Sequence, residues 1–234
     1  MNLDGARALV TGGSEGIGHG IARALAAKGA AVAITGRDQA KLVAAADELG
    51  VDAIRGDVGV EEDAVNAVAS FVEVHDGIDL LVNNAGFGIF KPLVEMDTES
   101  FDAVMSTNVR GAFFMAREAA RHFVTQGSGH LVNISSTSGL SGGKTSTAYS
   151  GSKFALRGMT ECWRAELRPH NVRVMLVNPS EVQTPFFEKT GKPREFSEKK
   201  LRADEIADAI VGALEIDDRG FIPEFSVWAT NPWE

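Results

Sequence analysis

Short apolar runs alternate with longer helical patterns along nearly the whole chain. The runs that predict strands span residues 6–11, 31–35, 52–55, 79–82, 130–134, 172–177 and 221–230. The stretches that predict helices span residues 21–27, 38–49, 61–74, 98–126, 148–168 and 203–214. Strands that are joined through helices form βαβ units and hence a parallel sheet. The alternation therefore predicts an α/β fold, and 234 residues with 44% hydrophobic content suit a single domain over residues 1–234.

The residues that follow these strands carry most of the distinctive chemistry. They are the glycine-rich turn 11–18, Arg37, Asp57, the Asn-Asn-Ala-Gly run at 83–86, Ser136 and Pro179. On an open parallel sheet, ligands bind outside the carboxyl ends of the strands. We therefore expect these segments to converge on one crevice.

The first turn reads TGGSEGIG, with Gly12, Gly16 and Gly18 in the spacing G-x-x-x-G-x-G. Glycine permits a tight turn and lets backbone amides approach an anion. The helix that follows offers free N–H groups to a pyrophosphate. The position between a strand and a helix favours dinucleotide binding over the alternative of a plain turn.

The end of the second strand indicates which dinucleotide is bound. In such folds an acidic residue there binds a ribose 2′-hydroxyl, whereas an arginine accommodates a 2′-phosphate. Gly36 occupies the acidic place and Arg37 follows it, which favours NADP(H) over NAD(H). Two residues oppose this interpretation, because Glu15 could repel a phosphate and Asp38 could turn toward a ribose. Arg37 as a solvated loop charge is a further alternative.

Asp57 and Val58 follow the third strand. Asp57 is placed to accept a hydrogen bond from the adenine amino group, and Val58 to cover the adenine ring. The alternative is that Asp57 only caps the next helix.

Tyr149 and Lys153 are i and i+4 on a predicted helix, so their side chains project from one face. Tyrosine has an unperturbed pKa of about 10. We expect the Lys153 ammonium to lower the pKa of Tyr149 and make it a proton donor or acceptor near neutral pH. Ser136, at the end of a strand, could bond the same substrate oxygen. Tyr-x-x-x-Lys alone is common on helix surfaces, so the remaining motifs carry the interpretation.

Composition excludes several classes of function. The net charge of −9 is opposite to the basic footprint of a nucleic-acid-binding protein. No apolar run approaches the length of a membrane span. One cysteine, Cys162, allows no intramolecular disulfide, and the five histidines are scattered without metal-ligand spacing. The N-terminus lacks the pattern of a signal peptide, so a cytoplasmic location is expected.

Apolar side chains are expected to line a substrate pocket; they are Phe87, Phe90, Leu140, Phe186 and Phe187. Lys91 and Lys144 are candidates to meet a substrate carboxylate, with solvated surface lysines as the alternative. Residues 186–202 are charged outside their first two aromatics and predict a lid, or else an ordinary surface loop.

Taken together, the chain resembles the short-chain dehydrogenase/reductase family. The resemblance covers nearly the full length and rests on TGGSEGIG at 11–18, NNAG at 83–86, Asn108, Ser136, Tyr149, Lys153 and the turn from Asn178-Pro179 to Thr184. It implies a Rossmann-type, doubly wound sheet of seven parallel strands in the order 3-2-1-4-5-6-7, with helices on both faces.

The resemblance also implies a role for each matched residue. Tyr149 would be the general acid or base, Ser136 would orient the substrate oxygen, and Lys153 would bind the nicotinamide ribose. Asn108 would hold a water in a proton relay to Lys153; the alternative for this mid-helix asparagine is a solvated residue. The implied cofactor contacts are Gly12, Ser14, Gly16, Ile17, Gly18, Arg37, Asp57, Val58, Asn84, Ala85, Gly86, Tyr149, Lys153, Pro179, Val182 and Thr184.

The implied activity is NADP(H)-dependent interconversion of a carbonyl and a secondary alcohol, by a homodimer or homotetramer acting on a small molecule. The alternatives are a 3-oxoacyl-acyl-carrier-protein reductase, a small 3-hydroxy acid dehydrogenase, an isomerase or dehydratase, and a nucleotide sensor without turnover. Two departures stand out. Ser180 replaces the family's usual glycine after Pro179, and Glu15 stands where NADP-preferring members often carry a basic residue.

Overall fold

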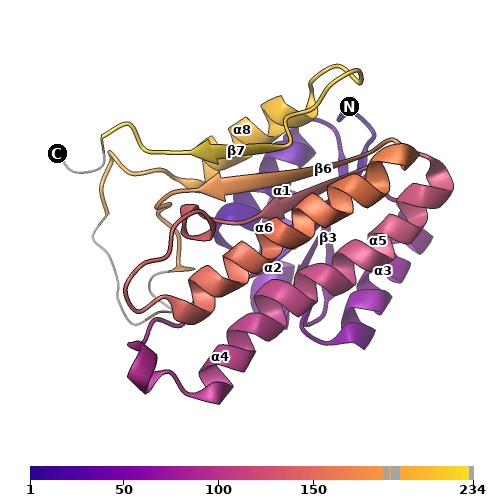
Figure 1. Ribbon diagram of the computed structural model, residues 1–234. Coiled ribbons are helices and arrows are strands. Elements are labelled where there is room, and N and C mark those ends of the chain that lie inside the picture. Colours follow the sequence, from indigo (N-terminus) through magenta and orange to yellow (C-terminus); the bar gives the residue numbers. More distant parts are fainter. Residues whose placement is uncertain (187–189, 191–195, 232–234) are drawn as a thin grey trace.

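The computed structural model describes residues 1–186, 190 and 196–231 (Figure 1). Within these residues, seven parallel strands form one sheet in the order β3-β2-β1-β4-β5-β6-β7, as the resemblance implied. The strands are β1 (Arg7–Thr11), β2 (Ala31–Gly36), β3 (Asp52–Arg55), β4 (Leu80–Asn83), β5 (Gly129–Ile134), β6 (Val172–Pro179) and β7 (Glu224–Val227).

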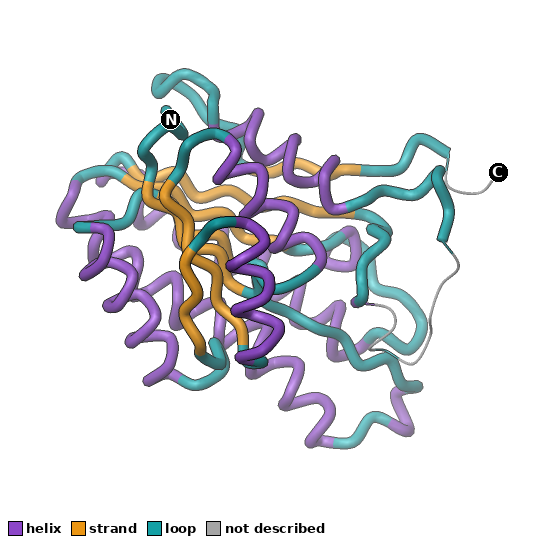
Figure 2. The backbone as a smooth tube through the Cα atoms, turned by 180° about the vertical axis from the view of Figure 1, so that it is seen from behind, coloured by secondary structure: helices purple, strands orange, loops and turns teal. Residues whose placement is uncertain are grey.

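Helices cover both faces of the sheet (Figures 1 and 2). One face carries α1 (Gly16–Ala27), α2 (Gln39–Leu49) and α8 (Ala203–Leu214). The other face carries α3 (Glu61–His75), α5 (Ala112–Gln126) and α6 (Thr147–Leu167), with α4 (Thr98–Met105) ahead of α5. This is the doubly wound arrangement that the alternation of strands and helices predicts.

The period of two along each strand divides the core between these faces. In β1, Ala8 and Val10 pack toward α1 and α8, whereas Leu9 packs toward α3 and α5. The register is continuous across the centre of the sheet, because Val10 pairs with Val82 and Val82 pairs with Val132. Fully buried strands of this kind hold the loops at their carboxyl ends in fixed relative positions.

Three predicted elements differ from the structure. The first helix begins at Gly16, inside the glycine-rich turn, and not at residue 21. The helix predicted over residues 98–126 is interrupted by a π-helical segment, Ser106–Gly111, between α4 and α5. The last strand is shorter than residues 221–230, because it pairs with β6 only from Glu224 to Val227. Pro223 precedes it and has no N–H with which to continue the ladder.

None of the helices in the described part of the chain combines the length and apolar character needed to cross a membrane. In the same residues, no group of three or more histidine, cysteine, aspartate or glutamate side chains is arranged to hold a metal ion.

Candidate active site

Two chain turns, after β1 and β4, are joined by hydrogen bonds at the carboxyl edge of the sheet. Thr11 Oγ1 accepts hydrogen bonds from the backbone N–H groups of Asn84 and Ala85, both at 3.0 Å. Asn84 Nδ2 donates to Thr11 O at 2.9 Å and to Gly12 O at 3.1 Å. The glycine turn and the NNAG run are therefore one rigid unit.

The glycines of this unit stand where a side chain would not fit. Gly12 and Gly16 have φ of 64° and 62°, in the left-handed region that favours glycine. A Cβ on Gly18 would lie 2.4 Å from Asn84 Nδ2, and one on Gly16 would lie 3.3 Å from the Thr184 side chain. The turns after β1, β4 and β6 thus come together, and the missing side chains of these glycines let them pack closely.

The turn after β6 is fixed by contacts with three other residues. Ser180 N donates to Val227 O at 2.9 Å, so the residue that departs from the family pattern is tied to β7. Val182 forms a parallel bridge with Leu201, and Gln183 both donates to and accepts from the Ser197 backbone. Sequence reasoning missed Gln183, for which its position between two predicted cofactor residues was the only available signal.

A cavity of about 500 Å³ opens beside this turn, between the start of α1 and the start of α8. Its lining includes Gly16, Val182 and Thr184 together with His19, Arg23 and Lys200. Two of these cations are already paired, since Arg23 contacts Asp204 and Lys200 lies 2.6 Å from Glu181. The cavity is therefore continuous with the predicted cofactor site.

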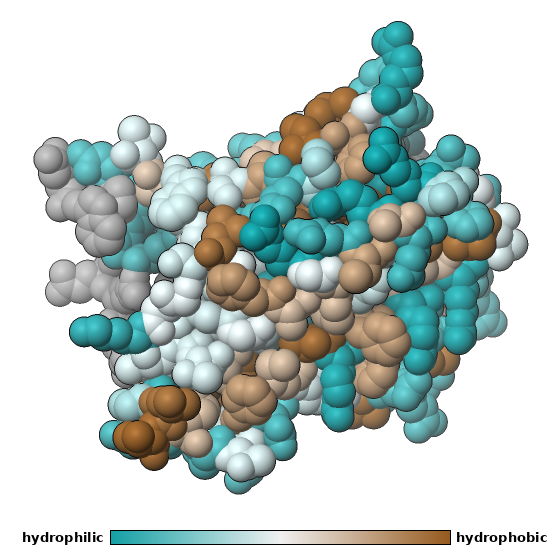
Figure 3. Space-filling view, viewed as in Figure 1, coloured by the Kyte–Doolittle hydropathy of each residue, from teal (hydrophilic) through white to brown (hydrophobic). Residues whose placement is uncertain are grey.

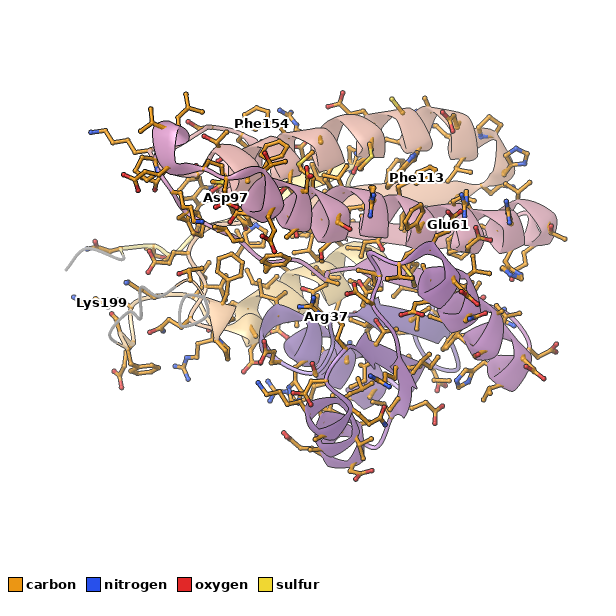
Figure 4. The ribbon with its side chains drawn as sticks, turned by 90° about the horizontal axis from the view of Figure 1, so that it is seen from below. Arg37, Glu61, Asp97, Phe113, Phe154 and Lys199 are labelled. Atoms are coloured by element: carbon orange, nitrogen blue, oxygen red, sulfur yellow. The ribbon has the colours of Figure 1, made fainter. Side chains whose placement is uncertain are left out.

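At the end of β2, Arg37 extends into solvent with its side chain 64% exposed (labelled in Figure 4). Its Nη1 lies 3.6 Å from Asp57 Oδ2. The other carboxylate oxygen of Asp57, Oδ1, accepts a hydrogen bond from Gly59 N at 2.9 Å. Val58 is buried. Asp57 thus does cap the following turn, while its second oxygen faces Arg37.

The two carboxylates that opposed NADP(H) binding have partners of their own. Asp38 Oδ1 accepts from Lys41 N at 3.1 Å and caps α2, so it faces the helix. Glu15 lies 3.9 Å from Lys41 Nζ, which offsets part of its negative charge. Ser14 approaches the same place, because its Oγ would lie 3.3 Å from a Cβ on Gly36.

Lys153 is buried beneath Tyr149 on α6. Its Nζ donates to Ile134 O at 2.8 Å and lies 5.8 Å from the centre of the Tyr149 ring. Burial lowers the pKa of Lys153 to about 8. The end of β5 therefore fixes the ammonium, and Ser135 Oγ helps by donating to Lys153 O at 3.3 Å.

Tyr149 has a raised pKa, contrary to the expectation from sequence. Burial disfavours the phenolate and is the larger cause, while a hydrogen bond with Ser136 acts in the opposite direction. Lys153 is directed at Ile134 O, and its charge does not outweigh the loss of hydration. The sequence indicated the neighbours of Tyr149, but not that its half-buried side chain loses enough hydration to raise its pKa.

Asn108 is buried in the π-helical segment and not solvated. Its Oδ1 accepts from Phe87 N at 3.0 Å, and its Nδ2 donates to Phe87 O at 2.9 Å and to Ser152 Oγ at 3.0 Å. Ser152 Oγ in turn donates to Tyr149 O at 2.7 Å. Asn108 therefore connects the loop after β4 to the turn of α6 that carries Tyr149.

Gly86 leaves space between Asn108 and Lys153. A Cβ on Gly86 would lie 3.1 Å from Asn108 Oδ1 and 3.6 Å from Lys153 Nζ. Asn108 Oδ1 accepts a hydrogen bond from Phe87 N and has a second lone pair. The role of Asn108 in a water relay stays a prediction.

A buried chain of polar side chains joins neighbouring strands and helices beneath the site, and the asparagines of the 83–86 run were expected to tie strands together in this way. Asn83 Nδ2 donates to Asn133 Oδ1 at 3.1 Å and to Ala112 O at 3.0 Å. Asn133 Nδ2 donates to Thr160 Oγ1 at 2.8 Å. This chain joins β4, β5, α5 and α6, and its only sequence signal is an asparagine at the end of each apolar run.

Of the expected pocket residues, Phe90 and Phe186 contact Tyr149 through their rings. Phe87 contributes its backbone to Asn108, and Leu140 is exposed. Phe187 and part of the predicted lid, residues 187–189 and 191–195, lie outside the described residues.

Comparison with known proteins gives one consistent result. A family model described as short chain dehydrogenase matches residues 6–195. An uncharacterized oxidoreductase of Staphylococcus epidermidis is 33% identical over 210 residues, covering 88% of this chain and 90% of the relative. An oxidoreductase of Staphylococcus saprophyticus is 35% identical over 214 residues, covering 89% and 90%.

Two solved structures have the same fold over 97% of this chain. An alcohol dehydrogenase from Thermococcus sibiricus, complexed with 5-hydroxy-NADP, has a TM-score of 0.88, 29% identity and 97% of its own chain covered. A 3-ketoacyl-(acyl-carrier-protein) reductase from Brucella melitensis, complexed with NADH, has a TM-score of 0.89, 28% identity and 98% of its own chain covered.

Proposed function

Because this chain belongs to the short-chain dehydrogenase family of oxidoreductases, we propose that it interconverts a carbonyl and a secondary alcohol with NADP(H). The observation that carries the proposal is the grouping of Ser136, Tyr149 and Lys153 at the end of β5 and on α6. Their hydroxyl, phenol and ammonium groups can together move one proton to or from a substrate oxygen.

The residues at the carboxyl edge of the sheet fit a dinucleotide. Gly12 and Gly18 let the turn after β1 pack closely on the 83–86 run, and the N–H groups at the start of α1 would bind a pyrophosphate. Ala85, Gly86, Val182 and Thr184 would border the nicotinamide, as the family resemblance implies. When bound, this cofactor supplies the hydride, and the chain supplies orientation and the proton.

In the proposed reaction, Ser136 and Tyr149 hold the carbonyl oxygen by hydrogen bonds. In the direction of reduction, Tyr149 donates its proton to that oxygen as negative charge develops on it. The raised pKa of Tyr149 keeps the phenol protonated at neutral pH, which suits a general acid. Lys153, charged below its pKa of about 8, then stabilises the phenolate left behind.

The preference for NADP(H) rests on Arg37. Its pairing with Asp57 is long and exposed, and such pairs contribute roughly 0–1 kcal/mol. A 2′-phosphate can form a bidentate, charge-assisted contact with the same guanidinium and compete with Asp57. Asp38 is engaged as a helix cap and Glu15 lies near Lys41, so neither carboxylate offsets Arg37 fully.

Titration of the protein with NADPH and with NADH, followed by nucleotide fluorescence, tests this preference. We expect NADPH to bind at least about tenfold more tightly, or about 1.4 kcal/mol. Arg37→Ala should remove the preference, whereas Arg219→Ala, which changes a distant exposed arginine, should keep it. Equal binding of both nucleotides by the unaltered chain would contradict the assignment of Arg37.

Turnover tests the chemistry. Tyr149→Phe should abolish carbonyl reduction while leaving NADPH binding within a few-fold, because the ring remains and only the proton donor is lost. Unchanged turnover in this variant would show that another group supplies the proton. A change in the redox state of the cofactor separates reduction from an isomerase, a dehydratase or a sensor.

Reduction of a 3-ketoacyl thioester is a second candidate activity, favoured by the similarity to the Brucella melitensis reductase. It predicts NADPH consumption with an acetoacetyl thioester at a rate above that with any free ketone. Slower turnover of the thioester than of a simple ketone would remove this candidate.

We also propose a homodimer or homotetramer built on the outer faces of α5 and α6. Phe113 on α5 is 39% exposed and Phe154 on α6 is 44% exposed (labelled in Figure 4), and apolar side chains gather on this face (Figure 3). Arg117 lies over the Phe113 ring at 5.4 Å. Light scattering should give a multiple of 24.9 kDa, and Phe154→Glu should reduce it to the single-chain mass.

A further inference from the structure

Three aromatic rings pack against one another around the proposed proton donor. The ring centres of Phe90 and Phe186 each lie 5.5 Å from that of Tyr149, and 6.4 Å from each other. Phe90 comes from the loop after β4 and Phe186 from the loop after β6. Tilted rings at 4.5–7 Å make favourable contacts beyond simple burial, so the two loops meet over Tyr149 through aromatic packing.

Gly88 shows how closely this cluster is packed. A Cβ on Gly88 would lie 2.8 Å from the Phe90 ring and 3.2 Å from the Phe186 ring. A residue with a side chain at position 88 would therefore displace one ring or the other. The backbone of the loop after β4 is built to let both rings approach.

Lys91, a candidate for binding a substrate carboxylate, instead contacts two residues at the start of α4. Its Nζ lies 2.5 Å from Asp97 Oδ2 and donates to Ser100 Oγ at 3.0 Å. Asp97 in turn caps α4 by accepting from Ser100 N at 2.7 Å. Lys91 therefore fixes the start of α4, and a substrate carboxylate would have to break this pair to bind it.

Any carbonyl that reaches Tyr149 must place its substituents close to the aromatic cluster. Hydrogen bonds to the hydroxyls of Tyr149 and Ser136 hold the carbonyl oxygen within about 3 Å of both. The neighbouring carbon atoms then lie beside the rings of Phe90 and Phe186. An apolar substituent gains contact there, whereas a carboxylate would lose hydration beside these rings. Among the described residues of this loop, the cation Lys91 is already paired with Asp97.

We propose that Phe90 and Phe186 determine substrate class, and that the substrate is a neutral ketone or aldehyde with an aromatic or branched apolar substituent rather than a small keto acid. This inference rests on the proposed carbonyl reduction. Phe90 and Phe186 contact the substituent directly, and Lys91 has no part in binding it.

The test compares acetophenone with acetoacetate in NADPH oxidation by the full chain. We expect kcat/KM to be about 10- to 100-fold higher for acetophenone, because an unpaired charge beside apolar groups is poorly tolerated. Phe90→Leu and Phe186→Leu keep the apolar bulk and remove the ring. Each should lower kcat/KM for acetophenone by about 2- to 12-fold, mainly through KM, and leave acetoacetate unchanged.

Two control variants test whether the effect on substrate preference is specific to the rings of Phe90 and Phe186. Phe101→Leu, on α4, should leave both substrates unaffected, and Lys91→Ala should not change the ratio between them. A higher kcat/KM for acetoacetate would overturn the proposal. So would a loss of acetoacetate turnover in Lys91→Ala, or equal effects of the Phe90 and Phe186 variants on both substrates.

A binding measurement distinguishes a wrong substrate class from a wrong assignment of reductase activity. Calorimetric titration of Tyr149→Phe with bound NADPH reports affinity for acetophenone and acetoacetate without turnover. Preferential binding of acetophenone, together with no NADPH oxidation by the unaltered chain, would support the substrate class and reject the reductase activity. Preferential turnover of acetoacetate would support the reductase and reject the substrate class.

Discussion

Replacing Ser136 with alanine is expected to make Tyr149 markedly harder to ionise. The pKa of Tyr149 is already raised by burial, and the hydrogen bond with Ser136 is what lowers it. A hydrogen bond to a charged group contributes about 1.5–3 kcal/mol. Its removal should therefore leave roughly 10- to 100-fold less phenolate at a given alkaline pH.

Lys153→Met should have a smaller effect on the same ionisation. The pKa of Lys153 is about 8, so the ammonium has lost its proton before Tyr149 titrates. Its Nζ is also directed at Ile134 O and lies 5.8 Å from the tyrosine ring centre. We therefore expect Ser136→Ala to shift the Tyr149 midpoint more than Lys153→Met does.

The assay is simple because Tyr149 is the only tyrosine in the chain. Ultraviolet difference titration follows tyrosinate formation without assignment, and Tyr149→Phe provides the blank. Circular dichroism at each pH excludes unfolding, which would return the tyrosine toward its ordinary pKa of about 10. A larger shift with Lys153→Met, or a Tyr149 midpoint below 10 in the unaltered chain, would refute the assignment of burial and Ser136 as the controlling causes.

Three further substitutions test the support of the site. Gly18→Ala, whose Cβ would lie 2.4 Å from Asn84 Nδ2, should separate the two turns and abolish NADPH binding in a fluorescence titration. Thr160→Val leaves Asn133 Nδ2 without its acceptor, so the free energy of unfolding in urea should fall by about 1–3 kcal/mol. His130 has a pKa lowered to about 4 from 6.5, mainly by burial, so the unfolded chain binds the proton more readily. Stability should fall between pH 6.5 and 4, by at most about 3 kcal/mol, and His130→Asn should flatten this dependence in urea titrations at each pH.

The sheet and most helices could be predicted, because the glycine and proline residues that end elements fall where the hydrophobic periodicity changes. The strand at 52–55 and the helix at 203–214 have the bounds that the sequence indicated. The π-helical segment was not predicted, because residues 98–126 contain no proline to mark an interruption of the helix. Asn108, a polar residue inside a helix, was its only trace.

The convergence of the site was predictable from topology, since every motif follows a strand of one parallel sheet. Pairings between side chains were not. The contact of Lys91 with Asp97 depends on rotamers and on where α4 begins. The pKa of Tyr149 depends on the rings of Phe90 and Phe186, which are 96 positions apart in sequence and meet only after folding.

The π-helical segment also sets the rotation of α5 about the helix axis relative to α4. Each residue of an α-helix advances the side-chain direction by about 100°. Deleting one residue between Val104 and Ala112 would restore regular α-helix and rotate α5 by about that angle relative to α4. Asn108 would then leave the Phe87 backbone, or Met115 and its neighbours would leave the sheet. We expect the length of this stretch to be less tolerant of change than its composition.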